Sequence, residues 1–308
     1  MPESVQFYAG ITDPKWFEFL AQLQPDEVNF WRPRSQNRFG AIKPGALFLF
    51  KLKGEPYFVG GGVFAHHSFV SLPFAWQSFE QKNGAGDYKS FERLILPHRP
   101  PEMRDRPLGC TIVVQPFFWP RPLWIPAPDE WAHGVQVGKV YDTGKQDGAA
   151  LWAEVQIRLQ GSVLGAVAES SEPTQPRYGE PRLVKSRLGQ GAFRVEVTDA
   201  YTRRCAITGE RTLPALEAGH IRPYAESGPH EINNGLLLRS DLHNLFDLGY
   251  LTVTFDYKVE VSRRIREEFE NGRDYYALHG KTLEVMPRQE AARPAREFLK
   301  WHHGIFKS

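Results

Sequence analysis

One stretch near the middle of the chain most constrains what it can fold into. Residues 169–182 read ESSEPTQPRYGEPR and combine Ser, Pro, Gly and charged residues without apolar periodicity. A segment of this composition buries little apolar surface and is typical of a linker. Because 308 residues suffice for two domains, we expect a first domain over residues 1–165, a linker over residues 166–186 and a second domain over residues 187–308.

The composition narrows the class of protein. Hydrophobic residues make up 41% and charged residues 24% of the chain, as in an ordinary globular protein, and the net charge of +2 indicates no particular partner. Two cysteines, Cys110 and Cys205, cannot form a four-cysteine zinc site and argue against a disulfide framework. Neither a long apolar run nor a secretory signal is present. We therefore expect a cytoplasmic protein without a membrane partner.

Before the linker, the pattern predicts a sheet with peripheral helices. Apolar runs bounded by turn residues predict strands over residues 46–53, 57–66, 110–118 and 135–141. Helices are predicted over residues 13–23, 76–82 and 90–96, the first with Asp13 at the N-cap position and Pro14 in its first turn. An α+β fold with a small β-barrel or curved sheet fits this alternation.

After the linker, the expected order is helix, strand, short helix and hairpin. Phe193, Val197, Ala200 and Tyr201 follow helical spacing. A strand is predicted over residues 216–221, and a hairpin over residues 251–255 and 258–261. Between them, residues 241–248 predict a helix, with Ser240 as the N-cap and Gly249 after its end.

Three polar residues in this second half have the types that phosphodiester hydrolysis requires. His220 ends the predicted strand, Asn234 lies in the following connection, and His243 lies on the short helix. One neutral imidazole can deprotonate a water, a second can hold a divalent cation, and an amide can fix the loop that orients the base. Each residue alone has an ordinary structural alternative, and only their combination favours catalysis.

Further charged residues surround this combination. Asp247 is four residues after His243 and shares its helix face, and an imidazole beside a carboxylate suits Mg²⁺ or Mn²⁺, with other divalent ions possible. Asp247 could instead bond a backbone amide. Arginines near the signature are candidate phosphate ligands, with an ion-paired or solvated surface as the alternative: Arg203, Arg204, Arg222 and Arg239.

Residues 187–308 resemble the HNH endonucleases of the restriction type, which have a ββα-metal fold. The matching pieces are GQGAFR, AYTRRCAITG, LEAGHIRPY, NGLLLRSDLHNLFDLGYLTV, the GRDYYALHGKTLEVMP tail and the closing LKWHHGIF, in that order. The resemblance implies His220 as general base, Asn234 as the residue that orients it, and His243 as a metal ligand. It also implies a divalent metal cofactor and double-stranded DNA as substrate.

The sequence departs from this family at Gly219. Many HNH centres have an aspartate immediately before the base histidine, and it supplies a metal ligand. With glycine at this position, Asp247 is our first candidate for the second ligand and Glu217 the second, with phosphate and water completing the shell. Cys205 matches a family cysteine position without its usual metal-binding partners, and we expect it to be buried.

Residues 28–142 resemble the PUA-like small barrels, a group that includes EVE, ASCH and SRA-type readers of modified bases. The matching pieces are VNFWRPR, IKPGALFLFKLK, FVGGGVF, AWQSFEQKNG and GCTIVVQPFF. Such a reader can hold a flipped base between aromatic faces. The candidate base-binding residues are Trp31, Phe64, Trp76 and Asn83, and for each aromatic residue packing in the core is the alternative.

Together these features predict a modification-dependent restriction endonuclease. The first domain would recognise a modified base in DNA, and the second would hydrolyse a nearby phosphodiester bond. Because one such centre cuts one strand, cleavage of both strands suggests a homodimer. The alternatives are a modified nucleic-acid reader with an inactive HNH domain, which Gly219 favours, and a nuclease that reads unmodified DNA sequence or acts on RNA.

Overall fold

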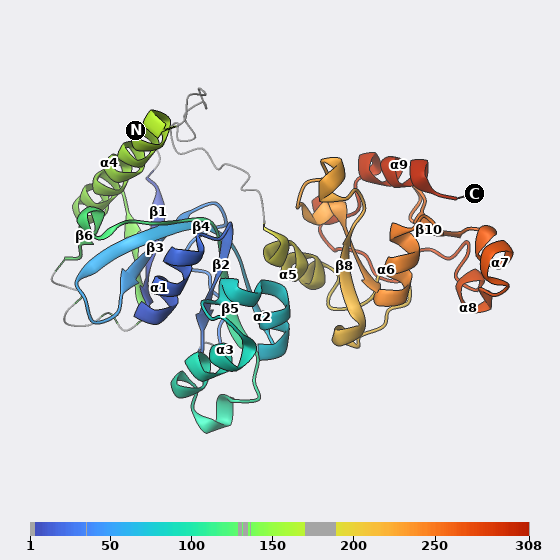
Figure 1. Ribbon diagram of the computed structural model, residues 1–308, viewed down its shortest axis with the longest axis horizontal. Helices are drawn as coiled ribbons and strands as arrows, with labels where there is room; N and C mark the ends of the chain where they lie inside the picture. Colours follow the sequence, from blue (N-terminus) through green and yellow to red (C-terminus); the bar gives the residue numbers. More distant parts are fainter. Residues whose placement is uncertain are drawn as a thin grey trace. The chain divides into compact units, whose positions relative to one another are not determined.

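The chain divides into two units, residues Met1–Ser186 and Arg187–Ser308. In the computed structural model (Figure 1), the described residues are 4–34, 36–128, 131, 135, 137–169 and 189–307. The linker predicted for residues 166–186 lies outside the described residues, apart from its first four residues. Those end the helix α4 (Gln146–Glu169).

A seven-stranded mixed sheet forms the centre of the first unit. Its strands follow the order β2-β5-β4-β3-β1-β7, and β6 pairs with β4. Strands β1 and β3 are parallel, and the other pairs are antiparallel. The strands are β1 (Gln6–Thr12), β2 (Glu27–Arg32), β3 (Leu47–Leu52), β4 (Tyr57–Val70), β5 (Leu108–Phe118), β6 (Ile125–Pro126) and β7 (Gly138–Asp142).

The predicted α+β class is confirmed, whereas the predicted closed barrel is wrong: the path of described strands runs from β2 to β7 without closing. Successive residues of a strand point to opposite faces, and on β1 both kinds are buried. Tyr8 packs in a core with helix α1 (Pro14–Leu23), and Phe7 packs in a core with α4. A closed barrel has one core inside the sheet, whereas this sheet packs against helices on both of its faces and so has a core on each side.

The edge strand β2 also has other partners for its outer backbone. The indole Nε1 of Trp16 donates to Asn29 O at 3.2 Å. The 3₁₀-helix η1 (Glu80–Asn83) packs against the same strand. A covered edge is one of the ways in which a sheet avoids further strand pairing.

The helices of the first unit confirm the predicted positions with shifted bounds. Asp13 caps α1 by accepting from Lys15 N and Trp16 N, as its position predicted. The other helices are α2 (Leu72–Phe79) and α3 (Tyr88–Ile95), near the predicted 76–82 and 90–96. Helix α4 was not predicted, and its described side chains Leu151 and Val155 are buried.

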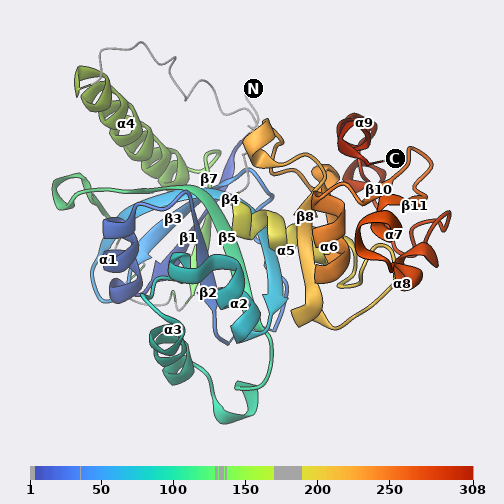
Figure 2. The ribbon, with the colours of Figure 1, turned by 45° about the vertical axis from the view of Figure 1, so that its right-hand side comes forward.

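The second unit contains the predicted ββα arrangement (Figures 1 and 2). Strands β8 (Leu216–His220) and β9 (Gly235–Arg239) pair antiparallel, and helix α6 (Ser240–Asp247) follows β9 directly. Helix α5 (Gln190–Ala200) packs against both strands. The hairpin β10 (Leu251–Val253) and β11 (Val259–Val261) is also as predicted, and α7 (Arg264–Phe269), α8 (Arg273–Tyr276) and α9 (Arg296–Ile305) complete the unit.

The core of the second unit fixes α6. Leu242 and Phe246 are fully buried on its inner face, and the Phe246 ring stacks on His302 of α9 at a centroid distance of 3.5 Å. His302 Nε2 bonds Phe246 O at 2.9 Å. Cys205 is buried in the same core, as predicted.

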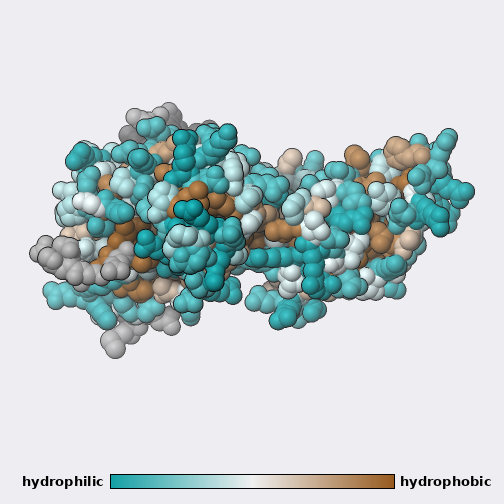
Figure 3. All heavy atoms as spheres, turned by 90° about the horizontal axis from the view of Figure 1, so that it is seen from below, coloured by the Kyte–Doolittle hydropathy of each residue, from teal (hydrophilic) through white to brown (hydrophobic). Residues whose placement is uncertain are grey.

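Polar residues cover most of the face that Figure 3 shows. No described helix is long and apolar enough to cross a membrane.

Replacing Phe246 should test how strongly α6 is fixed. We expect Phe246→Ala to lower the free energy of unfolding of the second unit by about 3–5 kcal/mol, because it opens a cavity beneath the helix. Phe269→Ala is the matched control, since Phe269 is 58% exposed. Urea unfolding of each full-length variant, monitored by hydrogen exchange in peptides from residues 190–307, measures the free energy of unfolding. An equal decrease in the two variants would contradict the assignment of Phe246 to the core.

Candidate active site

His220 lies at the last position of β8, between two aromatic contacts. Its ring stacks on Phe193 of α5 with centroids 3.8 Å apart and planes 9° apart. Its Nε2 lies 2.8 Å from Nδ1 of His230, whose own ring stacks on Tyr224 at 4.7 Å. Both the plane and one nitrogen of His220 are therefore fixed, which leaves Nδ1 as the other ring atom that can exchange a proton.

Burial keeps this imidazole neutral. It lowers the pKa of His220 to about 4, and the neighbouring His230 and His243 act in the same direction. At neutral pH the ring is therefore deprotonated and has a lone pair, which a proton acceptor requires.

Asn234 joins the two ends of the loop that carries His230. Its side chain is fully buried. The Asn234 Oδ1 accepts from Arg222 N at 2.9 Å, and its Nδ2 donates to Arg222 O and Pro229 O, each at 2.9 Å. Arg222, which follows His220 closely, and Pro229, which precedes His230, are thus held by the same side chain.

Two carboxylates flank His243 on α6. Its Nδ1 lies 2.7 Å from Glu217 Oε2, and its Nε2 lies 3.4 Å from Asp247 Oδ2. The hydrogen bond with His243 lowers the pKa of Glu217. Burial raises the pKa of Asp247, and the nearby Glu217 adds to that rise. A cation beside Asp247 would relieve this unfavourable charge.

The His243 ring occupies the space beside Gly219. A Cβ at Gly219 would lie 2.5 Å from His243 Nε2, which is closer than real contacts allow. The aspartate that many HNH centres have here would require the His243 ring to move. Within the described parts of the chain, no three His, Cys, Asp or Glu side chains gather as a metal site. One imidazole nitrogen and one carboxylate still form a donor pair that fits a divalent cation with other ligands from water or phosphate.

These side chains line one pocket of about 500 Å³. His220, His243, Glu217 and Asp247 all contribute to it, and Arg194 of α5 lies among them. Asn234 is not among the lining residues and acts from behind the pocket wall. Burial lowers the pKa of the Arg194 guanidinium, and Glu217 opposes this shift.

Sequence reasoning missed His230 and Arg194. His230 lies in the connection between His220 and Asn234, so a second imidazole between two signature residues was the available signal. Arg194 directly follows Phe193 in the matched segment GQGAFR. The contacts of both residues depend on how α5 packs against the loop, which spacing alone does not reveal.

None of the four predicted phosphate-binding arginines lines this pocket. Arg203 pairs with Asp199 at 3.6 Å, and Arg204 donates to Gly209 O. Arg222 Nε donates to Glu226 O at 2.6 Å.

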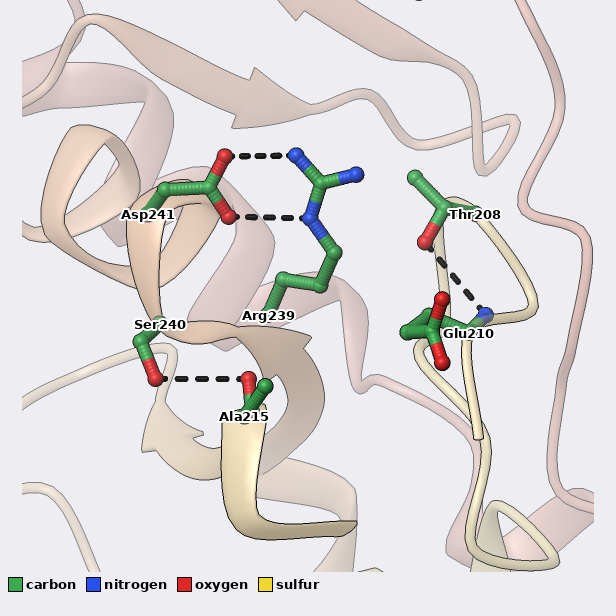
Figure 4. Close-up of polar contacts among 6 residues, drawn as sticks. All are labelled: Thr208, Glu210, Ala215, Arg239, Ser240 and Asp241. Atoms are coloured by element: carbon green, nitrogen blue, oxygen red, sulfur yellow. Dashed lines mark hydrogen bonds and ion pairs between the residues drawn. The ribbon is translucent and has the colours of Figure 1, made fainter. Parts of the chain in front are cut away.

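Arg239 forms two hydrogen bonds to Asp241 at the start of α6 (Figure 4), at 2.9 and 2.5 Å. Ser240, predicted as the N-cap, instead donates to Ala215 O at 3.3 Å. Arg239 and Asp241 therefore neutralise each other, which favours the ion-paired alternative for this arginine.

The four predicted base-binding residues differ in how far they are buried. Phe64 is buried in the core, and Asn83 is fully buried, with Nδ2 donating to Ala75 O and Glu80 O and Oδ1 accepting from Asn29. Trp31 is partly exposed; its Nε1 donates to Asn83 O, and its ring stacks on His98. Trp76 is partly exposed and packs against Phe91.

Comparison with known proteins places the signature in a family model. Residues 205–254, which include His220, Asn234 and His243, match the model of the HNH endonuclease family, and this match implies nuclease activity. Among solved structures, the chain is similar to a modification-dependent TagI restriction endonuclease, with 15% identity and a TM-score of 0.28 over 92% of this chain and 76% of that chain. No curated protein matches the chain.

Replacing Asn234 should loosen the loop between β8 and β9. We expect Asn234→Ala to lower the free energy of unfolding of the second unit by about 2–4 kcal/mol, because it leaves buried backbone groups of Arg222 and Pro229 unpaired. Amide exchange in residues 221–233 should accelerate. Asn233→Ala is the matched control, because Asn233 Oδ1 has no hydrogen-bond partner in the structure. Identical exchange in both variants would rule out this role for Asn234.

Proposed function

We propose that the chain is a modification-dependent DNA endonuclease, in which the second unit hydrolyses a phosphodiester bond and the first recognises a modified base. The observation that carries the nuclease proposal is the neutral, oriented imidazole of His220 in the same pocket as His243, Asp247 and Arg194. The pocket therefore contains a general base, a pair of groups that can bind a cation, and a guanidinium. Phosphodiester hydrolysis requires groups of these three kinds.

In this proposal His220 accepts the proton of the attacking water. Nε2 of His220 is engaged with His230, so Nδ1 is the atom that receives the proton. Asn234 does not touch the substrate; it holds the loop that keeps His230 against His220. Arg194 would face the phosphate, where guanidinium is well suited to bind two oxygens.

His243 and Asp247 would hold a divalent cation, Mg²⁺ or Mn²⁺ or another divalent ion, with Glu217 fixing the His243 ring through Nδ1. When bound, such an ion stabilises negative charge on the phosphate and the leaving oxygen. Arg203, Arg204, Arg222 and Arg239 would then contact the backbone farther from the scissile bond, by exchanging their present protein partners for phosphate.

The first unit would select the DNA. Trp31 and Trp76 keep part of their rings exposed and are the members of the predicted base-binding set that a base could stack on without unpacking the core. Phe64 and Asn83 would support this surface from within. Cutting both strands of double-stranded DNA would require two copies of the chain, and a homodimer is the simplest arrangement.

A second candidate function has its own supporting observation. The His243 ring fills the place of the missing aspartate at Gly219, and only one carboxylate remains beside Nε2. This arrangement favours a modified nucleic-acid reader whose HNH region no longer cuts. A nuclease that reads unmodified DNA or RNA shares the same site and differs only in substrate.

Cleavage of a matched DNA panel tests the proposal. The substrates are an unmodified plasmid, the same plasmid methylated at cytosine, and phage DNA with hydroxymethylcytosine, each with Mg²⁺, Mn²⁺ or EDTA, and structured RNA alongside. We expect metal-dependent cutting of modified DNA, and a loss of about 10²- to 10⁴-fold in rate for His220→Ala. His303→Ala is the matched control, because His303 is exposed and outside the pocket.

The other outcomes separate the candidates. Equal cutting of all DNA substrates would remove the modified-base role, and preferential cutting of RNA would remove DNA as the substrate. Binding of modified DNA without cutting under any metal would establish the inactive reader.

Two substitutions on α6 test the cation-binding pair. We expect Asp247→Asn to raise the Mn²⁺ concentration for half-maximal binding and cleavage by about 10- to 100-fold, because it removes one of two protein ligands. Asp241→Asn makes the same change on the same helix at a residue that pairs with Arg239, and should leave that concentration unchanged. Calorimetry measures Mn²⁺ binding by both variants, and cleavage rates at increasing Mn²⁺ measure its effect on activity. If Asp247→Asn had no effect and Glu217→Gln raised the required Mn²⁺ concentration, Glu217 would be the ligand.

A further inference from the structure

A second pocket lies in the first unit, where the chain leaves β2. It has a volume of about 520 Å³, and three arginines contribute to it, Arg32, Arg34 and Arg38. Tyr8 and Phe39 form its aromatic part. We call these five residues the arginine pocket. It shares no residue with the candidate active site or with the predicted base-binding set.

Among the described residues, no carboxylate pairs with the arginines of the arginine pocket. No Asp or Glu contributes to its lining. Among the ion pairs of the described residues, none involves Arg32, Arg34 or Arg38. Three guanidinium groups around one hollow repel each other, so an anion bound there would be stabilised.

Phe39 lines the pocket and is packed among other aromatic side chains. Phe39 is buried and packs against Tyr8 at a centroid distance of 5.0 Å and against Phe64 at 5.2 Å. The guanidinium of Arg32 lies over the Phe39 ring, 5.2 Å from its centroid. A cation held over an aromatic face loses little side-chain freedom when it binds a ligand.

Two hydrogen bonds connect the rim of the pocket to residues 98–106. Arg34 Nε donates to His98 O at 3.0 Å, which leaves the Nη groups of the same guanidinium for a ligand. Gln36 Oε1 accepts from Arg106 Nη1 at 3.5 Å. Residues 96–106 carry three arginines together with Glu102 and Asp105, and Arg99 is buried, so the pocket itself is where unpaired positive charge gathers.

We propose that the arginine pocket binds phosphate groups of the DNA backbone and thereby anchors the first unit on DNA. Guanidinium groups bind phosphate oxygens in pairs, and phosphate contacts set the position of a protein on a duplex. This inference rests on the proposed function only in taking DNA as the partner. It assigns no role in choosing the base or in cleavage.

DNA binding as a function of salt tests the arginine pocket. The full chain carrying His220→Ala binds a labelled duplex in EDTA, so that cleavage does not interfere. Each phosphate contact contributes about 0.9 to the slope of log affinity against log salt. We expect R32Q/R34Q/R38Q to bind at least about tenfold more weakly and to reduce the slope by about 2–3.

The matched control removes the same charge elsewhere in the first unit. Lys15, Lys53 and Lys89 are exposed and outside the pocket, and K15Q/K53Q/K89Q should change the slope by less than about 1. Equal effects of the two triple variants would overturn the proposal, because net charge alone would explain them. Because Arg32 packs on Phe39, R34Q/R38Q serves as a second variant that keeps this contact; it should reduce the slope by about 2.

The experiment separates failure of this proposal from failure of the nuclease. Unchanged binding by R34Q/R38Q in the His220→Ala chain, together with unchanged cleavage when R34Q/R38Q is placed in the chain that keeps His220, would overturn the arginine pocket alone. Pocket-dependent binding by a protein that never cuts would support the pocket and overturn the nuclease. Pocket-dependent binding of structured RNA in preference to the duplex would overturn DNA as the partner.

Discussion

The buried amide of Asn234 is the interaction on which the arrangement of the candidate active site depends. Strands β8 and β9 pair with His220 opposite Gly235, so the loop between them leaves and re-enters the hairpin at the site. Three hydrogen bonds from one side chain hold both parts of this loop. Without them, the backbone groups of Arg222 and Pro229 would need water, and His230 would lose its fixed position beside His220.

Two glycines on the same hairpin determine what packs against it. A Cβ at Gly219 would collide with His243, and a Cβ at Gly235 would lie 2.5 Å from Val197 and 3.0 Å from Phe193. The first glycine lets α6 bring an imidazole onto the strand, and the second lets α5 bring the Phe193 ring onto His220. The departure at Gly219 therefore changes the geometry of the site as well as its number of ligands.

The sequence predicted the second unit better than the first for a physical reason. The order strand, loop, helix depends on neighbours along the chain, with His220 at the end of the strand, Asn234 in the loop and His243 on the helix. Periodicity and capping report such local order. Closure of the β-sheet depends on distant partners: both Phe7 and Tyr8 are buried under different helices, and alternation within one strand could not show that. The same limit hid His230 and Arg194, whose contacts arise only when α5 meets the loop. For the same reason the sequence did not show that Phe64 and Asn83 are buried, although their side chains have the chemistry that base binding requires.

A net charge of +2 conceals two opposite local arrangements. In the candidate active site, Glu217 and Asp247 flank His243, so that pocket attracts a cation and, through the cation, a phosphate. In the arginine pocket no carboxylate lines the wall, so phosphate can bind there directly. Arg194 also lines the active-site pocket, where the charge of Glu217 acts on it, so the two pockets differ in their balance of charge: carboxylates and one arginine line the first, and arginines without carboxylates line the second. The local balance of charge in each pocket, rather than the net charge of the chain, is therefore what supports the proposal that DNA is its partner.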